Sequence, residues 1–145
     1  MTKFEQSFIV HRNINDVWNF YTDIKHLFVV TPPNVEISVE PNASIEQGAE
    51  IKLSGKLIRR SSWTARIKYC KPYEYFDEMI NGPFKIWKHT HRFIADNDST
   101  RVIDMVEYEL PYSIIGKLLD KIYVKNRIKE IFEYRRLATI AALEK

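Results

Sequence analysis

The sequence predicts an α+β domain in which a curved antiparallel sheet of about seven strands wraps around one long helix near the C-terminus. Two observations carry this prediction. Residues 113–144 contain no proline, their only glycine is Gly116, and they are rich in residues that favour helices. Upstream, short segments of alternating polarity follow one another with turn residues between them, as strands in hairpin succession do. Because a sheet and a helix each bury one face, the sheet is the natural partner of the helix.

The residue pattern of the N-terminal part predicts one strand followed by two short helices. Residues 4–10 alternate well enough for a strand with one apolar face. Asn15 can cap a short helix that begins at Asp16 and ends near Tyr21, and Asp23 can start a second helical turn.

The middle of the chain predicts six further strands. They alternate in polarity and are separated by turn residues such as Asn81-Gly82-Pro83 and Asp96–Ser99. We expect them at residues 35–39, 51–57, 63–70, 73–80, 87–93 and 102–110. No second domain or linker is visible, so residues 1–145 are expected to form a single domain.

The apolar residues of the C-terminal helix fall into two stripes. One contains Ile115, Leu118, Leu119 and Ile122, and the other contains Val124, Ile128, Ile131, Phe132, Ala138 and Ala142. At about 100° per residue, the second stripe is turned by roughly half the circumference from the first. If one sheet covers both stripes, the helix must bend between Ile122 and Asn126. If the helix is straight, both of its sides must be covered.

Composition narrows the classes of function. The 145 residues have a net charge of +3, which does not require a nucleic-acid partner, and we expect none. The single cysteine, Cys70, cannot form an internal disulfide and suits a reducing compartment. No apolar stretch reaches the roughly 18 residues of a membrane span, and residues 1–5 do not resemble a signal peptide. We therefore expect a cytoplasmic protein without an integral membrane segment.

The order of elements and several short motifs resemble the SRPBCC, or START/Bet v 1-like, superfamily of helix-grip domains. The motifs are residues 82–84, 87–93, Thr100, Asp104, residues 106–111, Gly116 and residues 132–135. The sequence is most similar to the branch described as polyketide cyclase/dehydrase-like or ligand-binding. The resemblance implies a deep apolar cavity between the sheet and the long helix, used for lipids, polyketides, hormones or other apolar molecules. It implies no single activity.

Three polar residues are expected on the inner face of the sheet. His89 and His91 are two residues apart in one strand and point to the same side, and Asp104 faces that side from the next strand. Two histidines and a carboxylate can bind iron or zinc, can exchange protons, or can satisfy one another inside the sheet. Any alternating strand can produce this spacing, so we expect neither a metal nor another cofactor. The three residues remain candidates for acid–base chemistry.

The turn at Asp96–Ser99 sets the register of the last hairpin. If Ala95 lies opposite Thr100, then His91 lies opposite Asp104, and His89 lies opposite Val106. An unpaired carboxylate on an inner face would be costly. We therefore predict a hydrogen bond from Asp104 to His91, or to His89 if the register slips.

Aromatic and apolar side chains are expected to line the cavity with these polar residues. The predicted lining consists of Trp63, Tyr69, Trp87, His89, His91, Phe93, Asp104, Tyr108, Ile128 and Phe132. Alternation also allows Arg59 and Glu78 to fall on inner faces of the sheet. Cys70 is expected on the opposite face from Trp63 and Tyr69. The basic residues of the last helix are interpreted as a solvated face: Lys117, Lys121, Lys125, Arg127, Lys129, Arg135 and Arg136.

Three functions follow from these patterns. The first is a carrier or sensor that binds an apolar small molecule such as a lipid, polyketide or aromatic compound. The second is an enzyme of the cyclase/dehydratase type that uses the histidines and Asp104 as acid and base. The third is a protein-interaction module. The sequence sets neither the ligand nor the oligomeric state.

Overall fold

The structure is a computed structural model that describes residues 1–33, 35–36, 38–39, 43–56, 60–111 and 118–145. Among these residues, seven strands form one antiparallel sheet in the order β1-β7-β6-β5-β4-β3-β2. The strands are β1 (Thr2–Val10), β2 (Ser38–Val39), β3 (Glu50–Lys56), β4 (Arg60–Lys71), β5 (Glu74–Asn81), β6 (Ile86–Asp96) and β7 (Ser99–Glu109). The predicted strand at 35–39 is thus short, and its residue 37 lies outside the described part.

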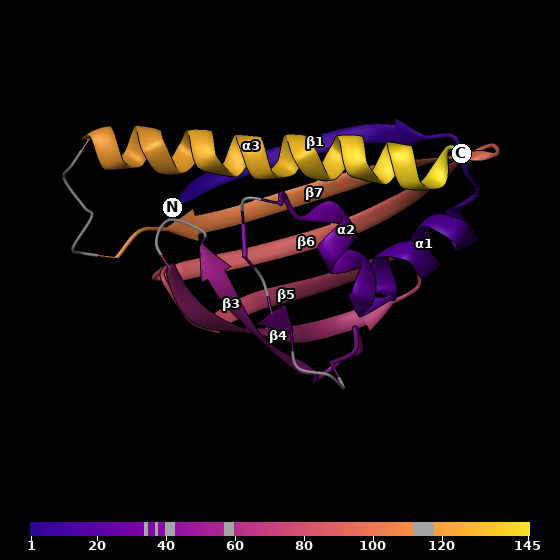
Figure 1. The fold of residues 1–145 in the computed structure, drawn as a ribbon. Coiled ribbons are helices and arrows are strands. Elements are labelled where there is room, and N and C mark those ends of the chain that lie inside the picture. The colour runs from indigo at the N-terminus through magenta and orange to yellow at the C-terminus, as the bar shows by residue number, and fades with distance from the viewer. Residues whose placement is uncertain (34, 37, 40–42, 57–59, 112–117) are drawn as a thin grey trace.

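The helices lie on one side of the curved sheet, which confirms the predicted α+β architecture (Figure 1). They are α1 (Ile14–Thr22), the 3₁₀ turn η1 (Ile24–His26), α2 (Leu27–Val30) and the long α3 (Leu118–Leu143). α3 runs beside β1, whereas α1 packs on β6 and β7, and α2 packs on α3. No helix in the described part of the chain combines the length and apolar composition needed to cross a membrane.

The first short helix begins two residues earlier than the sequence predicts. Its N-cap is Asn13, whose Oδ1 accepts a hydrogen bond from the Asp16 backbone N–H at 3.0 Å. Asn15, the predicted cap, instead accepts a hydrogen bond from the Tyr73 hydroxyl at 2.7 Å. That bond ties the helix to the turn between β4 and β5.

The last hairpin has the predicted register. Ala95 pairs with Thr100, and His91 pairs with Asp104. The β4–β5 pair is less regular, because its register shifts between Ile67 and Tyr69.

This shift changes the face of the residues that follow it. The Tyr69 hydroxyl bonds Glu74 at 3.0 Å, and its ring stacks on Phe76. Cys70 packs against the core instead. The predicted inward position of Tyr69 was therefore wrong. Cys70 does lie opposite Tyr69, but it shares a face with Trp63, contrary to the prediction, because strict alternation does not allow for a bulge.

Helix α3 is one uninterrupted helix from Leu118 to Leu143, and Figure 1 shows no bend in it. The predicted bend was wrong, and Ile122, the only residue of the first stripe whose side chain is described, is not covered by the sheet. Ile122 is 47% exposed, whereas Val124 and Ile128 are buried. The predicted start at residue 113, Ile115, and the side chains of Leu118 and Leu119 lie outside the described part.

Two apolar clusters fill the space between the sheet and the helices. The first gathers side chains of α1, β1 and β3 to β7, among them Val102. The second gathers side chains of β7 and α3, among them Val106 and Phe132. On β7, Asp104 lies in sequence between Val102 and Val106 and points to the same side. Asp104 therefore lies between core residues of the two clusters. Together with Asp77, His89, His91 and Arg135 it forms a connected group that we call the polar belt.

Candidate functional site

A cavity of about 200 Å³ lies between the sheet and α3. Its wall is formed by α1, η1 and α2, by the inner faces of β3 to β6, and by one face of α3. The lining residues are mostly apolar or aromatic: Phe20, Tyr21, Asp23, Ile24, His26, Leu27, Val30, Thr31, Val35, Ile45, Ile51, Leu53, Trp63, Ala65, Ile67, Tyr75, Asp77, Met79, Trp87, His89, His91, Ile128, Ile131, Phe132 and Arg135.

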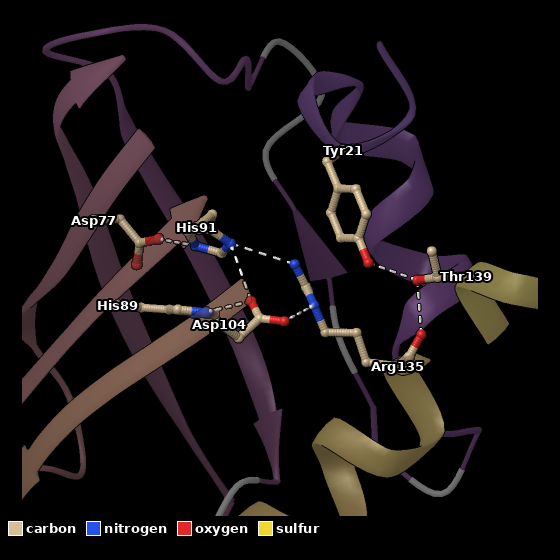
Figure 2. A network of polar contacts seen from close by, with 7 residues as sticks. All are labelled: Tyr21, Asp77, His89, His91, Asp104, Arg135 and Thr139. Atoms are coloured by element: carbon tan, nitrogen blue, oxygen red, sulfur yellow. Dashed lines mark hydrogen bonds and ion pairs between the residues drawn. The ribbon is translucent and has the colours of Figure 1, made fainter. Parts of the chain in front are cut away.

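The structure places six of the ten predicted lining residues on this wall: Trp63, Trp87, His89, His91, Ile128 and Phe132. Phe93 and Tyr108 belong to the two apolar clusters. Asp104 is 1% exposed and lies between the histidines and α3 (Figure 2). Tyr69 lies away from the cavity, for the reason given above.

Asp104 hydrogen-bonds His89, not the directly opposite His91. The distance from His89 Nε2 to Asp104 Oδ1 is 2.8 Å, whereas His91 Nδ1 is 3.6 Å from the same oxygen. The register did not slip, so the predicted link between register and partner was wrong. The reason is that His91 is held from the other side by Asp77 of β5 (Figure 2).

His91 lies at the centre of the polar belt and is held at both ring nitrogens. Its Nε2 is 2.7 Å from Asp77 Oδ2, and its Nδ1 is 3.3 Å from Arg135 Nη2. A guanidinium can only donate, so Nδ1 must accept, and the ring proton must sit on Nε2 and be donated to Asp77. Arg135 therefore fixes a neutral His91 in one tautomer.

Arg135 reaches this position from α3 and is 9% exposed. Its Nε is 3.6 Å from Asp104 Oδ2, and its guanidinium lies over the Tyr21 ring at 4.8 Å. Thr139 Oγ1 donates to the Arg135 carbonyl, so the Tyr21 hydroxyl donates to Thr139. Asp104 Oδ2 and Arg135 Nε have no hydrogen bond to a described residue. These two groups therefore pair by charge.

The two carboxylates have opposite pKa shifts. Burial by itself would raise the pKa of Asp104, but Arg135 and His89 overcome it and hold that pKa far below its usual range. Burial raises the pKa of Asp77 to about 6, and interactions with His89 and Arg135 only partly oppose the rise. Burial, His89 and Arg135 also lower the pKa of His91 well below its usual range. The belt thus holds a firmly ionised Asp104 and a titratable Asp77.

Three flat rings stack along the wall of the cavity. Tyr75 and His91 lie 3.9 Å apart at 14°, and His91 and His89 lie 3.6 Å apart at 28°. The possible ligand atoms of Asp77, His89 and His91 lie within 4.8 Å of one another. Stacked imidazoles hold their nitrogen lone pairs in nearly parallel planes, whereas a tetrahedral ion needs lone pairs that converge on one point. The ring geometry therefore suits a hydrogen-bonded network better than a chelate.

Sequence reasoning missed two members of the network, Asp77 and Arg135. Asp77 alternates with Tyr75 and Met79, so period two would have placed it on the inner face. Arg135 lies three residues after Phe132 and four before Thr139, on the buried stripe of α3. Its assignment to a solvated face was wrong. Two further charged residues, Glu78 and Arg59, were considered for the inner faces of the sheet. Glu78 forms an ion pair with Lys68 outside the cavity, and Arg59 lies outside the described residues.

No protein-family model and no curated protein matches this sequence. Solved structures do match. A START superfamily protein from Mycobacterium smegmatis has 12% identity and a TM-score of 0.74, covering 98% of this chain and 97% of that chain. The chain has the SRPBCC, or START/Bet v 1-like, helix-grip fold.

Two further structures with this fold are named for biosynthetic proteins. The di-domain ARO/CYC protein StfQ of the steffimycin pathway has 11% identity and a TM-score of 0.73, covering 98% of this chain and 50% of that chain. Norcoclaurine synthase from Thalictrum flavum, in complex with dopamine and hydroxybenzaldehyde, has 12% identity and a TM-score of 0.68, covering 99% of this chain and 87% of that chain. At these identities the likeness is one of fold.

Proposed function

We propose that the protein binds a small, mostly apolar molecule in the cavity between the sheet and α3, as a carrier or sensor. One observation carries the proposal. The cavity wall is apolar and aromatic except for a few polar groups, the largest cluster being Asp77, His89, His91 and Arg135. Apolar walls with a few placed polar groups are the usual form of a small-molecule site.

The size of the cavity limits the ligand. Its volume of about 200 Å³ lies below the roughly 300–1,000 Å³ of common ligand pockets. Trp63, Trp87 and Phe132 supply flat apolar surface on different sides of the cavity. Aromatic ligands in the norcoclaurine synthase neighbour support the same class. A molecule of one or two rings therefore fits better than a long lipid.

A second function is supported by the Asp77–His91 pair. These residues meet at 2.7 Å on the cavity wall, and the pKa of Asp77 is raised to about 6. A carboxylate of this kind can take a proton from a bound substrate, as in a cyclase or dehydratase reaction. Here Asp77 replaces Asp104 as the candidate base, because Asp104 does not line the cavity. The enzyme would lose turnover in Asp77→Asn while still binding apolar analogues.

A concave, mostly apolar cavity between the sheet and α3 favours a small molecule over a protein partner. Because the cavity is bounded by individual side chains, a substitution in its wall can change ligand binding while the fold is kept. We keep the expectation that the protein works in the cytoplasm, where the unpaired Cys70 thiol would stay reduced.

A cavity-filling variant tests the proposal. Ala65 lines the cavity from β4, whereas Ala95 is an exposed alanine near the end of β6. Naphthalene can be titrated into ¹⁵N-labelled protein while backbone amide shifts are followed by NMR. We expect shifts at cavity residues in the wild type and in Ala95→Leu, and binding at least about tenfold weaker in Ala65→Leu. Wild-type spectra that do not change at saturating naphthalene would contradict the proposal, as would equal affinity in Ala65→Leu.

Native mass spectrometry of freshly purified protein offers an independent check. A co-purified apolar molecule that is released by denaturation, and that is absent from Ala65→Leu, would identify the ligand class directly.

A further inference from the structure

We propose that the polar end of this cavity selects ligands that carry a hydrogen-bond donor, a hydroxyl or a protonated amine, and disfavours carboxylates. The proposal rests on the function proposed above and adds the chemistry of the ligand's polar group. It follows from how the belt distributes its charges and its free hydrogen-bonding atoms.

The first step concerns Arg135, the residue that would ordinarily hold an anionic ligand. Its charge is balanced by Asp104, whose Oδ2 lies 3.6 Å from Arg135 Nε. One terminal nitrogen donates to His91, and the Tyr21 ring covers the guanidinium face at 4.8 Å. The cation is therefore compensated before any ligand arrives.

The second step concerns Asp77, a second carboxylate on the same wall. Its side chain is 15% exposed and its Oδ2 accepts the His91 proton at 2.7 Å. Oδ1 makes no hydrogen bond to a described residue, and Figure 2 shows it turned away from the network. An ionised carboxylate oxygen can only accept, so this atom can take a hydrogen bond from a donor group on a ligand in the cavity.

The third step is the charge balance around Asp77. The groups that face it are His89 and His91 from β6, Asp104 from β7 and Arg135 from α3. Arg135 is paired with Asp104, His89 is hydrogen-bonded to Asp104, and the hydrogen-bond partner of Asp77 is the neutral His91. Among the described residues, no cationic group is therefore hydrogen-bonded to Asp77. A ligand ammonium or hydroxyl would satisfy its free oxygen, whereas a ligand carboxylate would meet a like charge in a poorly hydrated site.

This arrangement makes the selectivity depend on pH. Because burial raises the pKa of Asp77 to about 6, the carboxylate is ionised near neutral pH and becomes protonated on mild acidification. The preference for an ammonium ligand should then fade, while binding of the apolar body persists.

A matched series of ligands tests the proposal. Naphthalene, 2-naphthol, 2-naphthylmethylamine and 2-naphthoate share one apolar body and differ in the polar group. Affinities would be measured by NMR titration at about pH 7.5 and about pH 5, on either side of the Asp77 transition. At the higher pH we expect the amine to bind at least about tenfold more tightly than naphthalene, naphthol to bind in between, and naphthoate to bind most weakly.

Two neighbouring variants assign the effect. Asp77→Asn keeps the shape of the side chain and should remove the preference for the amine, measured as the ratio of amine affinity to naphthalene affinity in the same variant. Glu78→Gln removes a carboxylate from the next residue of β5, whose side chain bonds Lys68 at 3.4 Å, and should keep the wild-type order. The wild-type measurement near pH 5 needs no variant and should reproduce the Asp77→Asn result.

The outcomes separate this inference from the function on which it rests. Naphthoate binding as tightly as naphthalene, or an amine preference that survives Asp77→Asn, would overturn the selectivity and leave the binding function standing. Failure of all four compounds to bind would overturn both.

Discussion

Strand β5 carries three acidic side chains, and the two faces of the sheet treat them differently. Glu74 and Glu78 lie on the outer face, with ion pairs to Arg92 at 2.9 Å and to Lys68 at 3.4 Å. Asp77 lies on the inner face beside a neutral His91. The same kind of group thus has a basic ion-pair partner on the outer face and a neutral histidine as its partner on the inner face.

The pKa directions express this difference. Burial tends to raise the pKa of Glu74, but hydrogen bonds from Arg92 and Tyr69 overcome it and leave that pKa lowered. Burial raises the pKa of Asp77 to about 6, because His89 and Arg135 only partly oppose it. The comparison teaches that the inner face tolerates a carboxylate at a cost in stability. Such a cost is characteristic of functional sites more often than of structural braces.

The largest effect is expected at the buried ion pair. Asp104→Asn removes the charge that compensates Arg135 while keeping the side-chain shape. Breaking one member of a buried pair costs about 3–5 kcal/mol, because the other charge stays buried. Urea unfolding at neutral pH measures the loss. A loss below about 1 kcal/mol would show that Arg135 finds water or another partner.

The next effect is the pH dependence due to Asp77. The folded state raises its pKa from 3.8 to about 6, so the folded protein binds this proton more tightly than the unfolded chain. The stabilising contribution is therefore full below about pH 4 and is lost as the pH rises through about 6. The free energy of unfolding of the wild type, relative to Asp77→Asn, should fall by about 2–3 kcal/mol over that interval.

Glu74→Gln gives the matched control for this slope. Because the pKa of Glu74 is lowered from 4.5, its contribution is present above that value and lost as the pH falls below it. The two variants on one strand should therefore show opposite pH trends. Parallel trends would mean that the two faces do not differ as described.

A double variant measures how strongly the belt is coupled. Asp104→Leu leaves Arg135 without its partner, and adding Arg135→Met removes the stranded charge. We expect the second substitution to restore about 2 kcal/mol of the stability lost in the first. Additive losses in a thermodynamic cycle would show that the two residues act independently.

The smallest effect is expected on the outer face. Glu50 and Arg66 pair at 2.6 Å with side chains 43% and 41% exposed. Glu50→Gln should change the free energy of unfolding by at most about 1 kcal/mol, because exposed ion pairs contribute little. A loss as large as that of Asp104→Asn would remove the contrast between the faces.

The sequence was sufficient for the architecture and for three of the five belt residues, His89, His91 and Asp104. Alternation and the Asp96–Ser99 turn fixed the register of β6 and β7, and hence the closeness of Asp104 to a histidine. These features are local, so they can be read along one strand at a time. The hydrogen-bond partner depended on the neighbouring strand β5 and could not be read that way.

The rest of the site was hidden by long-range geometry. A bulge near Lys68 turned Tyr69 outward and Cys70 inward, and no residue type marks such a bulge. Arg135 sits among charged neighbours, and only its position on the buried stripe distinguishes it from solvated residues such as Arg136. Whether a charge on a helix is buried depends on the partner that meets it, here Asp104 of β7.

The most direct test of the central claim is the titration of the Asp77 carboxyl group. The claim is that Asp77 is the free acceptor at the polar end of a binding cavity. Its ¹³C carboxyl shift can be followed by NMR with and without 2-naphthylmethylamine. We predict a pKa near 6 in the free protein, and a lower one with the amine bound, because an ammonium favours the carboxylate. A pKa near 3.8 in the free protein, or one unchanged by bound amine, would contradict the account.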